Sequence, residues 1–174
     1  MFKRKKYNRA ILALNEFIER YPALPSTPYA YYLRGVIAEE KSSSILDKII
    51  TDSAQRDVQS VRDAYSYFSL LVETFPDSKY SEEALKKLVV LKNILARHEF
   101  YIALYYTSNG SHIAAINRSK YIIEHYPKSL SVADGLHLMA YNYDAINAED
   151  LANDARTVLY LSYPNYSPNY KIDK

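Results

Sequence analysis

Four aromatic–proline pairs divide this chain into segments that share one internal pattern. An alanine stands twelve residues before each proline, and a larger apolar residue stands five before it. These offsets, together with the aromatic residue itself, fall on one face of an α-helix, and proline cannot continue a helix. Each pair therefore predicts the end of an amphipathic helix. The pairs are Tyr21-Pro22, Phe75-Pro76, Tyr126-Pro127 and Tyr163-Pro164, the alanines are Ala10, Ala64, Ala115 and Ala152, and the larger residues are Phe17, Leu71, Ile122 and Leu159.

A second helix is predicted after each of the first three prolines. Eight residues on, a small residue is followed by a larger apolar one, in the pairs Ala30-Tyr31, Ala84-Leu85 and Gly135-Leu136. Ser81 before two glutamates, and Ser131 with Asp134 as a capping-box variant, resemble helix start signals. Helix, proline turn and helix, with small residues at packing positions, is the pattern of the tetratricopeptide repeat.

The repeat spacing is longer than usual at two places. Successive prolines are 54, 51 and 37 residues apart, whereas the usual period is about 34 residues. The first excess predicts an insertion, partly loop, at about 39–61, because it contains three consecutive serines. The second predicts one long helix from about Ser81 to Tyr106, with an apolar stripe formed by Leu85, Leu88, Leu91, Leu95 and Ile102.

These patterns together predict an all-α fold, a tetratricopeptide-repeat-like right-handed helical solenoid of about seven helices. We expect a single domain over 1–164 and a flexible tail over 165–174. Three glycines among 174 residues agree with this, because hairpin turns in sheets favour glycine. The segment Ala10–Tyr21 resembles the second helix of a repeat that lacks its first helix, which predicts an N-terminally incomplete chain.

Composition excludes several functions. A net charge of +2 with scattered lysines does not predict nucleic-acid binding. The absence of cysteine excludes disulfides, thiolate chemistry and a lipid-accepting thiol within these residues. No stretch approaches the roughly 20 apolar residues that span a bilayer, and the N-terminus does not resemble an export signal.

The sequence also lacks the motifs of common enzymes. Histidines at 98, 112, 125 and 137 show no metal-ligand spacing, and three glycines are too few for a phosphate loop. The serines stand in no recognised nucleophile motif. We therefore expect a non-enzyme without metal or cofactor.

Longer stretches resemble the BamD family. Residues 95–106, Leu-Ala-Arg-His-Glu-Phe-Tyr-Ile-Ala-Leu-Tyr-Tyr, and residues 114–118, Ala-Ala-Ile-Asn-Arg, match that family in order and spacing. Similar agreement occurs at 31–35, Arg56-Asp57 and 75–80, so the resemblance covers roughly residues 10–164.

The resemblance implies a scaffold subunit of the outer-membrane β-barrel assembly (BAM) complex. Its implied partners are the POTRA domains of BamA, other lipoproteins of the complex and unfolded outer-membrane protein precursors. The implied location is the periplasmic face of the outer membrane, reached through a lipidated cysteine that these residues lack. The alternative is a generic adaptor that binds extended peptides in a concave groove.

Six residues are candidates for protein binding by this resemblance: Asn117, Arg118, Tyr105, Tyr106, Arg56 and Asp57. Arg118 is expected to be the anchor, because a guanidinium fork pairs bidentately with a carboxylate on a partner. Two alternatives for Arg118 are an intramolecular salt bridge and a solvent-exposed side chain. The tyrosines could instead pack between helices.

Overall fold

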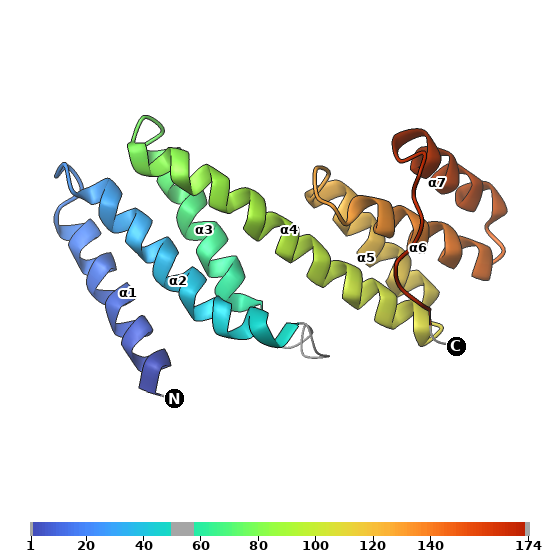
Figure 1. The fold of residues 1–174 in the computed structure, drawn as a ribbon, viewed down its shortest axis with the longest axis horizontal. Helices are drawn as coiled ribbons and strands as arrows, with labels where there is room; N and C mark the ends of the chain where they lie inside the picture. The colour runs from blue at the N-terminus through green and yellow to red at the C-terminus, as the bar shows by residue number, and fades with distance from the viewer. Residues whose placement is uncertain (1, 50–57, 173–174) are drawn as a thin grey trace. The chain divides into compact units, whose positions relative to one another are not determined.

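The computed structural model describes residues 2–49 and 58–172, and side chains over 6–41 and 58–172 (Figure 1). The described ranges contain seven helices and no strand. This confirms the all-α fold and the expected number of helices. The helices are α1 (Phe2–Arg20), α2 (Thr27–Ile49), α3 (Gln59–Thr74), α4 (Lys79–Ser108), α5 (His112–His125), α6 (Val132–Ala145) and α7 (Glu149–Ser162).

The chain forms two compact units, residues 1–95 and residues 96–174. In the first unit α1 packs on α2 and α2 on α3, and in the second α5 packs on α6 and α6 on α7. Neighbours in sequence are thus neighbours in space, which is the organisation of a helical repeat protein. The expectations of one domain over 1–164 and of a right-handed superhelix stay predictions.

The aromatic–proline turns are built alike. Helices α1, α3, α5 and α7 each end at the residue before the aromatic one, as predicted. In all four turns the aromatic N–H donates to the carbonyl of the apolar residue four positions earlier, at 2.7–2.9 Å. In two turns a hydroxyl also binds the aromatic carbonyl, from Thr27 to Tyr21 at 2.5 Å and from Ser81 to Phe75 at 2.6 Å.

Helices α4 and α6 end differently, because a residue in the left-handed conformation follows two positions after the last helical residue. Gly110 has φ +70° and Asn147 has φ +60°. The next N–H, of Ser111 or Ala148, donates to a carbonyl five residues earlier, at 2.9 Å in both cases. This is the Schellman arrangement, which satisfies helix-end carbonyls where the chain reverses.

The repeated apolar positions form the core of each unit. Ala64, Ala115 and Ala152 are completely buried, and their larger partners Leu71, Ile122 and Leu159 are at most 1% exposed. The first copy differs, because Ala10 and Phe17 on α1 are only half-buried.

One member of the predicted apolar stripe on α4 was wrong. Leu85 is 50% exposed, whereas Leu91 and Leu95 are buried, and Leu88 and Ile102 are half-buried. The adjacent Ala84 occupies the buried position, and the next residue of a helix points about 100° away from it. The long helix itself is confirmed, as α4 begins and ends within two residues of the predicted bounds.

The predicted insertion at about 39–61, expected to be partly loop, stays a prediction, because its centre is not described. Residues 39–49 continue α2, and α3 begins at Gln59, while residues 50–57 lie outside the described residues. Three serines are weak helix formers, each costing only about 0.5 kcal/mol relative to alanine, and so they do not end a helix.

The capping-box expectation at Ser131 was also wrong. Ser131 precedes α6, but its side chain makes no capping hydrogen bond. Asp134 is instead engaged by Arg97 and Tyr166. A strong charged partner on another element outcompetes the local cap.

A candidate protein-binding surface on helices α4 and α5

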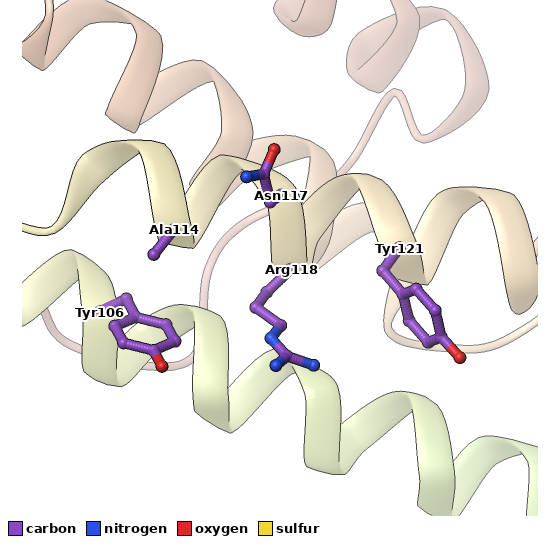
Figure 2. A pocket seen from close by; sticks show the side chains of 5 residues that line it. All are labelled: Tyr106, Ala114, Asn117, Arg118 and Tyr121. Atoms are coloured by element: carbon purple, nitrogen blue, oxygen red, sulfur yellow. The ribbon is translucent and has the colours of Figure 1, made fainter.

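One face of α5 and the last turns of α4 line an open depression of about 370 Å³. Four of its five residues stand on α5 at offsets of zero, three, four and seven, which place them along one helical face. Figure 2 shows them above α4, which contributes the fifth residue. The lining residues are Tyr106, Ala114, Asn117, Arg118 and Tyr121. We call this the α4–α5 surface.

Arg118 is held by an ion pair with α4. Its Nη1 donates to Oε2 of Glu99 at 2.9 Å, and the Glu99 side chain is 2% exposed while that of Arg118 is 44% exposed. The intramolecular salt bridge, one of the two alternatives from the sequence, is therefore present. The Arg118 side chain nevertheless remains 44% exposed, so the ion pair does not remove it from the surface.

The neighbouring candidates lie around this cation. Asn117 is exposed and projects away from Arg118, as Figure 2 shows. Tyr106 is half-buried in the lining, and Tyr105 is 53% exposed just outside it, with the two ring centroids 5.7 Å apart. Three of the six predicted residues thus line the depression, and a fourth, Tyr105, contacts one of them. The other two, Arg56 and Asp57, lie outside the described residues.

Sequence reasoning missed three contributors to the surface. Glu99 supplies the buried carboxylate, and Ala114 and Tyr121 complete the lining. The Tyr121 ring stacks on His125 with centroids 3.9 Å apart. The signal that could have found the lining is the helical spacing of Ala114 and Tyr121 around the two predicted residues.

The described side chains include no cluster of three or more histidine or acidic residues that could bind a metal ion. Within the same described part of the chain, no helix combines the length and apolar character needed to cross a bilayer. The α4–α5 surface offers a cation, an amide and aromatic rings, which are groups that recognise another protein.

Comparison with known proteins identifies the family. The family model described as outer membrane lipoprotein, YfiO, matches residues 1–159. The chain belongs to the YfiO/BamD family. The resemblance found in the sequence is thereby confirmed, and the α4–α5 surface is a feature of a member of that family.

Curated relatives carry the name outer membrane protein assembly factor BamD. The chain is 35% identical over 164 residues to that of Neisseria gonorrhoeae, covering 94% of this chain and 61% of the relative. It is 33% identical over 159 residues to the one from Haemophilus influenzae, covering 91% and 61%. Against Xylella fastidiosa, identity is 30% over 166 residues, covering 95% and 57%. The chain therefore spans about three fifths of the length of these BamD proteins.

Proposed function

We propose that this chain is a non-catalytic scaffold subunit of the BAM complex, and that its α4–α5 surface binds the POTRA domains of BamA. Membership in the YfiO/BamD family and the names of its relatives as assembly factors support this role. Other lipoproteins of the complex and unfolded outer-membrane protein precursors are the further proposed partners. The proposed location is the periplasmic face of the outer membrane.

The single observation that carries the proposal is the state of Arg118. Its guanidinium is fixed by a carboxylate that is 2% exposed, yet 44% of its side chain remains exposed. A cation already held in one conformation loses less side-chain entropy when a partner binds. A partner carboxylate can pair with the outer edge of the fork, and arginine is enriched at the centres of interfaces.

The surrounding residues extend the contact. A depression of about 370 Å³ holds only a few side chains, whereas a specific interface buries roughly 800 Å² on each partner. Exposed Asn117 projects from α5 in another direction than Arg118, and exposed Tyr105 lies beside Tyr106 of the lining, so both add polar and aromatic area for a larger interface. We therefore propose that a partner places an acidic side chain at Arg118 and covers both neighbours.

The test measures the affinity of the chain for isolated POTRA domains of BamA by calorimetry. Arg118→Ala alone would also destabilise the fold, because it removes an ion-pair partner of buried Glu99. We therefore combine Arg118→Met with Glu99→Gln, which removes both charges while keeping similar volumes. The expected result is at least about tenfold weaker binding, equivalent to roughly 1.4 kcal/mol.

Arg156→Ala provides the matched control. Arg156 is also a helical arginine, its side chain is 40% exposed, and it pairs with Asp144 on the neighbouring helix. Its removal should leave affinity unchanged. Undiminished binding by the Arg118 double variant, or an equal loss with Arg156→Ala, would contradict the assignment of the surface.

The second candidate function is the generic adaptor. It would bind short extended peptides in the absence of BamA, whereas the scaffold requires a folded POTRA partner. Residues 163–172 of the chain itself contact α4 and α6, which shows that these helices can hold a segment without helix or strand. This observation favours peptide binding, at a place separate from the α4–α5 surface.

A further inference from the structure

The segment after α7 returns onto the helices of its own unit. Residues 163–172 contain no helix or strand, and Figure 1 shows this part of the chain running back across α6. The Tyr166 hydroxyl donates to Oδ1 of Asp134 at 2.8 Å, and the Tyr170 hydroxyl lies 2.7 Å from Nδ1 of His137. The sequence predicted a flexible tail here, and nothing in its pattern indicated these contacts.

The helices present a prepared surface to this tail. Asp134 is only 8% exposed, and its second oxygen accepts a hydrogen bond from Arg97 at 2.6 Å. Arg97 lies over the ring of Phe100, 4.2 Å from the centroid, and the Tyr170 ring meets that same ring edge-on at 4.8 Å. We call Arg97, Phe100, Asp134 and His137 the tail-docking surface.

The acceptors of this surface suit tyrosine in particular. Burial raises the pKa of both Tyr166 and Tyr170, so each hydroxyl stays protonated and able to donate. The Asp134 carboxylate accepts the Tyr166 hydroxyl, and Nδ1 of His137 shares a hydrogen bond with the Tyr170 hydroxyl. Both rings lie near the imidazole, with centroid distances of 5.7 and 5.8 Å.

The tail itself has an internal repeat. Pro164-Asn165-Tyr166 and Pro168-Asn169-Tyr170 are the same tripeptide, four residues apart. Each proline restricts its own φ and the residue before it, which reduces the entropy lost when the segment docks. The hydrogen bonds described for residues 167–172 come from the Tyr170 hydroxyl, so the contact depends on side chains at a fixed spacing. Another polypeptide with that spacing could make the same contact.

We propose that the tail-docking surface is a binding site for segments of other proteins that carry two tyrosines four residues apart with proline between them. The chain's own tail occupies this site as an intramolecular competitor. The site shares no residue with the α4–α5 surface, so the proposal does not depend on binding to BamA.

The test uses a fluorescent peptide with the sequence of residues 163–172 and measures its anisotropy on binding to the full chain. In the variant Tyr166→Ala/Tyr170→Ala the tail loses its anchors, while the docking surface keeps all its residues. A short tether gives the tail an effective concentration in the millimolar range. The variant should therefore bind the peptide at least about tenfold more tightly than the wild type does.

Three controls make the result specific. Tyr21→Ala/Tyr29→Ala removes two tyrosines that are each 44% exposed in the other unit and should bind the peptide as weakly as the wild type. A peptide with both tyrosines changed to phenylalanine should bind the tail-released variant several-fold more weakly. Adding His137→Phe to that variant should also weaken binding, because the hydrogen bond between the imidazole and the tyrosine hydroxyl is lost. Circular dichroism verifies that each variant is folded, and Tyr166→Phe/Tyr170→Phe is the milder variant if the alanine pair unfolds.

Two results would overturn the proposal. One is a peptide affinity that is the same for the wild type and the tail-released variants. The other is a concentration-dependent dimer of the wild type that disappears in those variants, because the surface would then serve self-association.

Discussion

Gly35 in the first unit and Gly135 in the second differ in whether their surroundings leave room for a side chain. A Cβ at Gly35 on α2 would lie 2.5 Å from Cε1 of Phe68, a ring that is completely buried. At Gly135 on α6 the nearest atom to a Cβ would be the Ser119 carbonyl oxygen, at the ordinary distance of 3.5 Å. Gly35 is therefore required by packing, whereas Gly135 is not.

We expect the two alanine variants to differ in stability, with only Gly35→Ala being destabilised. Gly35→Ala should lower the free energy of unfolding by about 1–3 kcal/mol, because a buried ring cannot move aside without strain. Gly135→Ala should leave it unchanged or raise it by about 0.5–1 kcal/mol, because alanine favours the helix. Urea unfolding of the wild type and both variants measures this, and equal losses would contradict the packing described at Gly35.

Arg34 is a buried cation with few partners. It is 8% exposed, it donates to Oδ1 of Asn15 at 2.9 Å, and its guanidinium lies 4.3 Å from the centroid of the Tyr67 ring. Its Nε and Nη2 find no acceptor among the described residues. Burial lowers the pKa of the Arg34 guanidinium, which is the sign of an unfavourable environment for charge.

Replacing this cation should therefore cost little. We expect Arg34→Met to lower the free energy of unfolding by no more than about 1 kcal/mol, because the unsatisfied donors disappear and the apolar volume is kept. Arg34→Ala, which leaves a cavity, should lower it by about 2–3 kcal/mol. A loss of similar size in both variants, measured by urea unfolding, would show that the charge itself stabilises the unit.

At the scale of helices, the ends were predictable because their signals are local. The proline after each aromatic residue cannot continue the helix, so α1, α3, α5 and α7 end where the sequence predicted. Burial was less predictable, because it depends on which neighbours pack against a helix. Leu136 is 3% exposed on α6, which packs against both α5 and α7, whereas Leu85 in the corresponding position on α4 is 50% exposed.

The contacts of the tail with α6 depended on long-range proximity and were not predictable. Asp134 was assigned to a local cap, and it binds Arg97 and a tyrosine 32 residues later instead. For the α4–α5 surface, the family resemblance located Asn117 and Arg118. The sequence did not indicate that Glu99 pairs with Arg118, because the two residues are 19 positions apart on different helices.

The contact between the tail and α6 is expected to weaken in acid. Burial lowers the pKa of His137, and Asp134 opposes this shift. In the folded state His137 therefore binds a proton less readily than in the unfolded state, where its pKa is the ordinary 6.5. The contribution of neutral His137 to the free energy of unfolding is fully present above pH 6.5, and it decreases as the pH falls below that value.

Urea unfolding at pH 7.5, 6.5 and 5.5 measures this dependence in the wild type and in His137→Phe. The wild type should lose more stability between pH 7.5 and 5.5 than the variant does. The other charged groups around the imidazole are present in both proteins, so they cancel in the comparison; they are Asp134, Asp144 and Arg156. Identical pH profiles would show that His137 does not contribute.

At the scale of the molecule, the four described residues proposed to contact BamA belong to one unit. Tyr105, Tyr106, Asn117 and Arg118 all lie within residues 96–174. The internal ion pair of Arg118 and the exposed residues near it belong to the surface that we propose as the binding site. The scaffold role therefore rests on whether a partner covers this surface.

Site-specific photocrosslinking tests that claim most directly. A photoreactive amino acid placed at exposed Asn117, and separately at Tyr160 on α7 as a control that is 52% exposed, is irradiated with POTRA domains of BamA present. We expect a covalent adduct with the POTRA domains from position 117 and none from position 160. Adducts from position 160 alone, or from neither position while the two proteins still bind, would contradict it.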